Sequence, residues 1–481
     1  MIANKQLTKS KLIQFFCSDF ARGLFTGMVA NYLVYILQTD PTKTGLPVLL
    51  PNNKFLGFLT VLSIITLVSK IFDAVSDPLL ANLSDKSKNP RGRRIPFMQV
   101  SAVPYAICCV MIFFAPFKEQ SIGNALWVGV FMVLYFLFYT IYSIPQRALI
   151  PEILPDAKQR VGAYSISTVF FMGGSAIAYT AEMLVALIKK SGIASIWAWR
   201  IVFVVFGVIG MVLLLVSAFC IKEKEYLKTT KPPQEKFLSS FKKVVKNKQF
   251  MIVTFGDLFN YIAMAFFQST MFYYMTYLIG LDEGQSMFVL VPAIATAMLF
   301  FPVIVKVCKK YNKKTPLLIA SGMFTILFTA IYFGDVLPLP PLVKGIGMGL
   351  IIAYPFAAIN IVPQAIVSDV IQEDTLATGE NREGIYSAVK TFLEKMAYAV
   401  AWLLVSVVLS IGAKEGSAVG LQGVKITGLI AGGFSLLSFI VMFFYNDKSI
   451  TKSINEKRAK LQETLDVAEQ EVVTITDVVE N

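Results

Sequence analysis

Residues 69–94 read SKIFDAVSDPLLANLSDKSKNPRGRR, and this segment carries most of the information about the fold. Asp73 and Asp77 lie one helical turn apart within an apolar run, so both carboxylates share one face of a helix. A charge in hydrocarbon costs at least about 2.5–3.5 kcal/mol, and intramembrane acids therefore usually line an ion or substrate path. The basic run that follows, ending in Arg93 and Arg94, marks the cytoplasmic end of a membrane helix. We interpret the two acids as a cation site, with Na⁺ as a candidate ion.

The composition of the whole chain agrees with a membrane protein. Its 481 residues are 56% hydrophobic and only 16% charged, whereas a soluble protein carries about 25% charged residues. Apolar runs of 20 residues or more recur, which is the length that crosses a hydrocarbon core about 30 Å thick. Only helices and closed barrels satisfy the backbone in lipid. Continuous apolar runs, rather than alternating ones, select helices.

We predict an all-α membrane protein with twelve transmembrane helices. The expected spans are residues 12–37, 55–83, 95–117, 122–150, 162–188, 199–221, 250–279, 286–308, 315–334, 342–368, 384–412 and 424–445. A polar segment with two adjacent prolines, Pro232 and Pro233, splits the chain into two six-helix halves. The predicted parts are an N-terminal six-helix bundle (1–221), a cytoplasmic central loop (222–249), a C-terminal six-helix bundle (250–446) and a cytoplasmic tail (447–481). This 6+6 layout is typical of transporters with a site between repeated bundles.

Charged loops predict the orientation. Basic residues crowd the N-terminus and the loops between spans 2 and 3, 6 and 7, and 8 and 9, whereas the intervening loops carry few. The positive-inside rule then places both termini in the cytoplasm of a multi-pass protein of the cell (inner or plasma) membrane. The loop between spans 10 and 11 is acidic, but acidic residues count little in that rule. The net charge of +13 reflects cytoplasmic anchoring, and no nucleic-acid partner is expected.

Several chemistries are excluded by composition. The chain has no histidine, which removes His metal ligands, His-based triads and His proton relays. Its five cysteines have neither zinc-site nor disulfide spacing. No nucleophile–base set is present, so we expect no enzyme and no cofactor beyond a coupling ion, Na⁺ or H⁺ and possibly Li⁺. A non-transporting sensor would normally carry a signalling domain, which the short tail does not offer.

Two groups of charged residues fall inside the N-terminal spans. Asp19 and Arg22 lie one turn apart in span 1, either as a local ion pair that anchors the helix or as a substrate-site pair. In span 2, Lys70 precedes Asp73, Ser76 and Asp77. A single lysine cannot neutralise both acids, so we expect one carboxylate to remain for a mobile cation or proton.

Span 4 adds further polar candidates. The hydroxyl of Thr140 is either a cation ligand or bonded to its own helix. Arg147 is a candidate for an anionic substrate group, because a guanidinium matches a carboxylate. The alternative for Arg147 is an ion pair with Glu152 or Asp156 near the cytoplasmic side.

The C-terminal half contributes fewer candidates. Asn260 lies on one face of span 7, followed by aromatic residues that include Tyr273, and aromatic rings stack on sugars. Lys395 enters the membrane in span 11 and needs a carboxylate partner. That partner is either the acid pair of span 2, across the bundle, or the nearby Glu394.

Five segments together resemble the glycoside–pentoside–hexuronide:cation symporters, the branch of the major facilitator superfamily that includes melibiose permease. The matching segments are DAVSDPLLANLSD (73–85) with the basic loop after it, SDFARGLFTGMVANYLVYILQTD (18–40), IPQRALIPEILPDAKQR (144–160), STMFYYMTYLIG (269–280) and SDVIQEDTLATGENREGIYSAVKTFLEKMAYAVA (368–401). The resemblance implies the major facilitator fold, alternating access and coupling to Na⁺, Li⁺ or H⁺.

The resemblance also implies roles for particular residues. It assigns Asp73 and Asp77 to cation binding, with Thr140 as a further ligand and Ser76 at a position that is often Asn. Asp19 corresponds to a sugar-hydroxyl acceptor, and Lys395 to the lysine that balances the acids.

Three departures alter the sugar half of the site. Ser143 stands where melibiose-type members have a second sugar-binding Asp, Ile166 stands near the position of an Arg, and Ser18 replaces a Lys. The galactoside site is therefore not intact, and another glycoside, a pentoside or a uronide is expected. Arg22 and Arg147 favour an acidic sugar.

The sequence thus predicts a secondary active transporter that couples a cation to a sugar, glycoside or uronide and functions as a monomer. Its predicted substrate contacts are Asp19, Arg22, Ser143, Arg147, Asn260 and Tyr273; Asp73, Asp77, Ser76 and Thr140 are predicted to bind the cation, and Lys395 and Lys70 to balance charge. The alternatives are a cation-coupled transporter of a lipid-like amphipathic solute and a membrane sensor.

Overall fold

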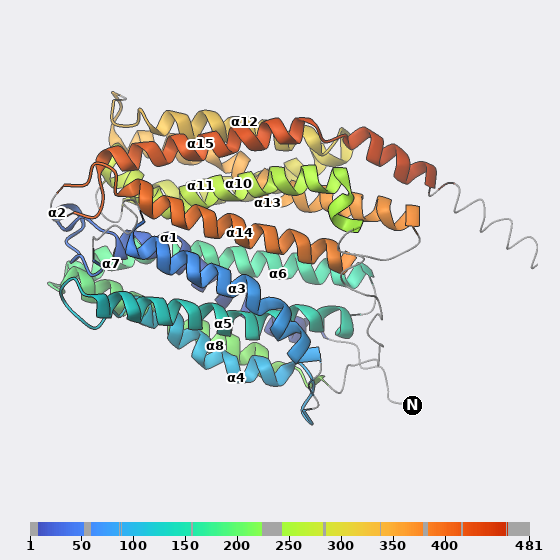
Figure 1. Ribbon diagram of the computed structural model, residues 1–481, viewed down its shortest axis with the longest axis horizontal. Helices are drawn as coiled ribbons and strands as arrows, with labels where there is room; N and C mark the ends of the chain where they lie inside the picture. Colours follow the sequence, from blue (N-terminus) through green and yellow to red (C-terminus); the bar gives the residue numbers. More distant parts are fainter. Residues whose placement is uncertain are drawn as a thin grey trace, which may run out of the picture.

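The structure, a computed structural model, describes residues 8–51, 59–85, 87, 89–154, 157–223, 243–281, 285–336, 338–378, 383–414, 417–457 and 459. These residues form long helices that run side by side along the molecule (Figure 1). Local signals start several of them. Side-chain oxygens of Thr8, Ser121 and Asn247 cap the helices that follow by accepting a hydrogen bond from a backbone N–H two or three residues on.

The N-terminal half forms one bundle of six spans, one of them broken. Its helices are α1 (Lys9–Leu37), α3 (Val61–Asp85), α4 (Ile95–Met111), α5 (Ile122–Ile153), α6 (Ala157–Ala178) with α7 (Ala181–Lys189), and α8 (Ser195–Cys220). The short helix α2 (Pro41–Thr44) follows α1 at one end of the molecule. We call this the α2 end (left in Figure 1) and the opposite one, where α1 begins, the Lys9 end.

The C-terminal half forms the second bundle. It comprises α10 (Lys248–Tyr273), continued by the π-helical turn η2 (Tyr274–Ile279), then α11 (Ser286–Lys310), α12 (Lys314–Ile331), α13 (Pro341–Thr378), α14 (Glu383–Leu409) and α15 (Leu421–Phe443). Ten of the described helices are long and apolar enough to cross a membrane, and α4 is a shorter apolar helix. The 25-residue α3 is also long enough, but it carries Lys70, Asp73 and Asp77.

The two bundles repeat the same internal packing. In the first bundle, α1 packs on α6 and α8, α4 packs on α5 and α8, and α3 packs on α5. In the second bundle, the equivalent helices pair in the same way: α10 with α14 and α15, α12 with α13 and α15, and α11 with α13. The bundles meet where α3 packs on α14 and α1 packs on α10. The chain is therefore a pair of structurally repeated six-span units.

One polar contact is repeated in both bundles. Just after α8, the buried carboxylate of Glu223 accepts hydrogen bonds from the backbone N–H groups of Arg93, Arg94 and Ile95 at the start of α4. Just after α15, the carboxylate of Asp447 accepts one from the N–H of Lys313 at the start of α12. An acid after the sixth span thus stabilises the N-terminus of the third span in each half, where the helix dipole favours negative charge.

The predicted spans agree with the observed helices apart from their ends. The span predicted over 162–188 corresponds to the candidate membrane span Ile166–Lys189, and the structure adds a short break between α6 and α7 near Tyr179 and Thr180. Helix α13 continues ten residues beyond the predicted end at 368. Ion pairs of Asp369 with Lys313 and of Glu373 with Lys457 hold this extension. Most of the predicted central loop and the end of the tail lie outside the described residues, so those domain limits stay predictions.

Candidate functional site

The two acids of α3 meet a lysine from the other bundle. The Nζ atom of Lys395, on α14, lies 2.7 Å from Oδ1 of Asp73 and 2.6 Å from Oδ2 of Asp77. Helical spacing places both carboxylates on the face of α3 that packs against α14. The expected partner for Lys395 across the bundle is therefore the one the structure shows, while the neighbouring Glu394 pairs with Lys390 instead.

Two hydroxyl groups lie beside these acids and differ in what they contact. Thr140, on α5, lies 3.2 Å from Oδ1 of Asp73 and 3.1 Å from Oδ1 of Asp77, so its hydroxyl faces both carboxylates. Ser76 donates instead to the backbone carbonyl of Asp73. Thr140 thus adds an oxygen to the acid pair, whereas Ser76 bonds its own helix. Their predicted roles as cation ligands stay predictions.

A second lysine, Lys70, also lies beside the acid pair. Nζ of Lys70 lies 3.6 Å from Oδ2 of Asp73 and 3.9 Å from the centre of the Phe136 ring, with Trp402 next to it at 5.0 Å. Aromatic faces stabilise a cation at such distances. Two lysines therefore face two carboxylates. In this arrangement Lys70 and Lys395 together supply two positive charges, so each carboxylate of the pair faces a lysine.

A separate polar cluster surrounds Asp19 inside the first bundle. Arg22 pairs with Asp19 on α1. From α5, the side chain of Gln146 donates to Ser18 Oγ at 2.7 Å and to Asp19 Oδ1 at 3.3 Å. All four side chains are buried. Within the described residues, Asp19 Oδ2, Gln146 Oε1 and two Arg22 nitrogens (Nε and Nη1) have no hydrogen-bond partner.

Close helix packing fixes this cluster. At Gly23, an added Cβ would lie 2.0 Å from the carbonyl oxygen of Phe171, and at Gly174 it would lie 1.9 Å from that of Phe20. Only glycine allows α1 and α6 to approach so closely. Tyr139, on α5, lies close enough to both Arg22 and Lys395 to interact electrostatically with each.

The other predicted substrate contacts are more dispersed. Ser143 is buried in α5, whereas Arg147, one turn further on, is exposed. Its alternative partner Asp156 and the side chain of Glu152 lie outside the described part of the chain. In the second bundle, Asn260 exchanges hydrogen bonds with Ser321 of α12. Their contacts with a substrate stay predictions.

Tyr273 belongs to a set of contacts that closes the α2 end between the bundles. Its hydroxyl donates to the carbonyl oxygens of Val34, at 2.9 Å, and Gln38. The Gln38 side chain donates to the carbonyl oxygens of Ser406 (2.8 Å) and Ala418 (3.1 Å), and accepts from Ser406 Oγ at 2.6 Å. The sequence prediction did not include Gln38. The only sequence signal for Gln38 is that it is a single amide side chain at the end of an apolar run.

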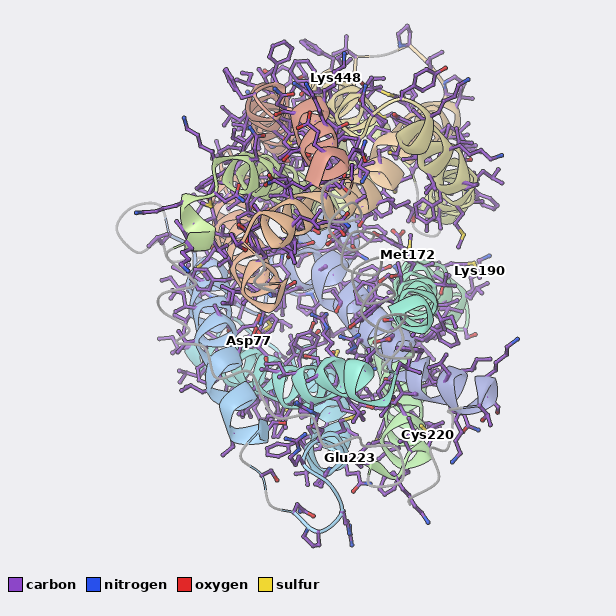
Figure 2. All side chains as sticks on the ribbon, turned by 90° about the vertical axis from the view of Figure 1, so that its right-hand side faces the viewer. Asp77, Met172, Lys190, Cys220, Glu223 and Lys448 are labelled. Carbon is purple, nitrogen blue, oxygen red and sulfur yellow. The ribbon has the colours of Figure 1, made fainter. Side chains whose placement is uncertain are left out.

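The two acids of α3 differ in exposure. The side chain of Asp77, which lies one turn nearer the Lys9 end, is 26% exposed, whereas that of Asp73 is 2% exposed. Viewed from the Lys9 end, Asp77 lies where α3 comes close to α14 (Figure 2). The bundles are thus hydrogen-bonded together at the α2 end, and the acid nearer the Lys9 end, Asp77, is the more exposed of the pair.

This arrangement has the properties of a membrane transporter. Two repeated bundles enclose ion-paired groups at their interface, and opening one end while closing the other exposes those groups to each side in turn. The architecture is the major facilitator fold.

The chain belongs to the family described as MFS/sugar transport protein, whose model matches residues 52–447. It is 23% identical to the uncharacterized symporter YnaJ of Bacillus subtilis, with 92% of each chain covered. It is also 23% identical to the lactose permease of Leuconostoc lactis (96% of this chain and 74% of that one) and 22% identical to the isoprimeverose transporter of Lactiplantibacillus pentosus (94% and 91%).

Solved structures agree on the fold. The inward open xylose transporter XylE from E. coli superposes with a TM-score of 0.62 at 13% identity, covering 94% of this chain and 99% of that one. The nucleoside transporter NupG gives a TM-score of 0.62 at 14% identity, covering 91% and 99%. The protein is a multi-pass membrane transporter and not an enzyme, and the lipid-solute and sensor alternatives are not favoured.

Proposed function

We propose that this protein is a cation-coupled symporter of a sugar or glycoside that works by alternating access. The observation that carries the proposal is the contact of Lys395, from one bundle, with Asp73 and Asp77 of the other. Because Lys395 of one bundle is held by the acids of the other, the relative position of the bundles depends on whether the lysine or a cation occupies Asp73 and Asp77. The lactose and isoprimeverose carriers among the relatives support a sugar as the second solute.

The orientation follows from charge. At the Lys9 end, Arg91, Arg93, Lys222, Lys246 and Lys310 lie close to helix ends. The positive-inside rule makes this end cytoplasmic, in the cell membrane, with both termini inside. The closed α2 end then faces outwards, and the described conformation is inward-facing.

The coupling ion would replace Lys395 at the acids. Na⁺, Li⁺ and H⁺ all bind carboxylate oxygens, and Thr140 offers a further oxygen to a metal ion. A cation and the lysine ammonium cannot both occupy the space between Asp73 and Asp77 at these distances. Cation binding would therefore release α14 from α3 and change the interface between the bundles.

The sugar would bind near Asp19. A sugar hydroxyl both donates and accepts, and this cluster offers free atoms of both kinds: two carbonyl or carboxylate oxygens, and two guanidinium nitrogens. The pair of Asp19 and Arg22 is neutral overall, which suits a neutral sugar, while the free nitrogens of Arg22 suit the carboxylate of a uronide. We further propose that a monomer is the functional unit.

The test is uptake into proteoliposomes with a panel of glycosides, pentosides and uronides, with and without a Na⁺ gradient and at two external pH values. We expect accumulation of at least one sugar that depends on a cation gradient and is abolished in the double variant Asp73→Asn/Asp77→Asn. Asp335→Asn is the matched control, since Asp335 pairs with Lys425 in a partly exposed bridge. Gradient-driven accumulation that persists in the double variant would overturn the proposal.

A further inference from the structure

A third ionic cluster lies inside the C-terminal bundle. The Nζ atom of Lys390, on α14, lies 3.0 Å from Oδ2 of Asp257, on α10, and also pairs with Glu394. The side chains of Asp257 and Lys390 are 2% and 6% exposed, whereas that of Glu394 is 24% exposed. We call these three residues the α10–α14 triad.

The charges of the triad do not cancel. Two carboxylates, the buried Asp257 and the partly exposed Glu394, share one ammonium group, which leaves one net negative charge on the triad. The two other buried clusters balance: Asp73 and Asp77 face two lysines, and Asp19 faces Arg22. A buried uncompensated charge is costly, and such groups usually become neutral by binding a proton.

A second observation also indicates a missing ligand. Among the residues that the structure describes, Oδ1 of the buried Asp257 has no hydrogen-bond partner. Oδ2 has only the ionic contact with Lys390, and Oδ1 has none. Buried polar atoms are nearly always hydrogen-bonded, so an orphaned oxygen on a fully buried acid is unusual.

Most charged groups described on the elements packed against α10 and α14 pair elsewhere. Helix α1 carries the Asp19–Arg22 pair and, at its start, Lys9 and Lys11; α13 carries Lys344 near the α2 end, Asp369 and Glu373, which pair with Lys313 and Lys457, and Asp374. From α10, the Tyr261 ring lies 5.7 Å from Nζ of Lys390, and from α14, Tyr398 faces Asp257 and Glu394. Across the interface, α3 presents Lys70, Asp73 and Asp77, whose charges are matched with Lys395. Helix α15 also packs on α10 and α14, and among its described residues the charged group is Lys425, near the far α2 end.

We propose that the α10–α14 triad is a proton-binding site, in which Asp257 binds one proton while Lys390 keeps its charge. A proton fits better than a metal ion, because it can bind the unpartnered Oδ1 of Asp257 while the Lys390 ammonium stays in place. A sugar would not supply the positive charge. Protonation of one carboxylate makes the triad neutral and gives it a donor. The partly exposed Glu394 provides the route to water for the buried Asp257.

The site goes beyond the proposed cation pair of α3. Lys390 and Lys395 lie on the same helix, five residues apart, and Lys395 links that helix to Asp73 and Asp77. A proton in the triad therefore changes the charge beside the helix that joins the bundles. Protonation of the triad is a property of the protein itself and does not depend on which solute is transported.

The experiment is infrared difference spectroscopy of the purified full-length protein during a pH titration in the absence of sugar, where a protonated buried carboxyl group gives a C=O stretching band. We expect the wild type and Asp73→Asn/Asp77→Asn to show this band, and Asp257→Asn to lose or shift it. Glu394→Gln is a conservative change at a partly exposed position, and it should shift the band. This variant tests the proposal if Asp257→Asn fails to fold. Glu456→Gln, at an exposed surface position, should leave the band unchanged.

Three results would overturn the proposal. The first is a band that is the same in wild type, Asp257→Asn and Glu394→Gln. The second is a band that disappears only in Asp73→Asn/Asp77→Asn. The third is loss of the band when NaCl is added at constant pH and ionic strength, if this loss is seen only in proteins that retain Asp257. That result would make the triad a metal-cation site. None of these results depends on transport, so failure here is distinct from failure of the symport proposal.

Discussion

Lys395 and Asp73 connect the two bundles, with 2.7 Å between Nζ and Oδ1, although 321 residues separate them in the chain. The contact lies in the middle of both helices, where water reaches only one side. An ion pair in such a place is expensive to break without a replacement. The lysine and the coupling cation are therefore alternatives at the same acids, and variants of Lys395 should separate their effects.

Lys395→Gln should bind the coupling cation more tightly than the wild type. The variant removes the competitor from Asp73 and Asp77, and a charge-assisted hydrogen bond is worth about 1.5–3 kcal/mol, so we expect affinity to rise by roughly tenfold or more. Trp402 lies beside Lys70 and provides a local fluorescence signal for cation binding to the purified protein.

The same variant should lose net uptake but retain exchange. Without Lys395, the cation-free carrier holds two acids opposite one lysine, and moving this charge through the closed state is unfavourable. Exchange of internal for external sugar keeps the cation bound throughout and avoids that state. Lys395→Arg, which retains the charge, is the control and should show neither change. Weaker cation binding in Lys395→Gln would contradict the competition model.

Gln38→Ala should shift the protein towards the conformation that is open at the α2 end. It removes three hydrogen bonds between α1 and the region around Ser406 and Ala418, each worth about 0.5–1.5 kcal/mol. A loss of that size raises the open population by about tenfold or more. Next to this contact lies a cavity of about 160 Å³ that Ser417 helps to line. We expect Ser417→Cys to react faster with an impermeant thiol reagent added outside when Gln38→Ala is also present.

The matched control for this prediction is Gln422→Ala, which removes an exposed glutamine at the same end of the molecule. It should leave the labelling rate unchanged. Equal labelling of Ser417→Cys with and without Gln38→Ala would show that the amide does not hold the closed end.

Arg22→Lys should separate acidic from neutral substrates. The change keeps the charge next to Asp19 but removes the planar fork that binds a carboxylate through two parallel hydrogen bonds. If a uronide binds here, its uptake should fall by about tenfold while neutral glycosides are little affected. Arg22→Gln extends the comparison, and we expect this variant to lose uptake of uronides only. An equal loss for both classes would assign Arg22 to stabilising Asp19 rather than to recognising a carboxylate.

The sequence predicted the twelve spans and the acid pair because those features are local. Apolar runs identify helices, and i, i+4 spacing places Asp73 and Asp77 on one face without knowledge of the fold. The interaction partners of the buried polar residues, in contrast, are distant in the sequence. The aromatic surroundings of Lys70 come from α5 and α14, and the contacts of Gln38 come from residues about 370 positions away. Lys390 pairs with Asp257 on another helix as well as with its neighbour Glu394. Helical periodicity alone does not reveal the pairing with Asp257.

Glu223→Gln should destabilise the first bundle more than Asp447→Asn destabilises the second. The Glu223 carboxylate accepts from three backbone N–H groups at the start of α4, whereas Asp447 accepts from one at the start of α12. An amide keeps an oxygen acceptor but loses the charge, and hydrogen bonds to charged groups are worth about 1.5–3 kcal/mol against about 1 for neutral ones. We expect the melting temperature in detergent to fall clearly for Glu223→Gln and by a smaller amount for Asp447→Asn, with Glu456→Gln unchanged. Equal melting temperatures for Glu223→Gln and the wild type would mean that the helix dipole of α4 does not need this charge.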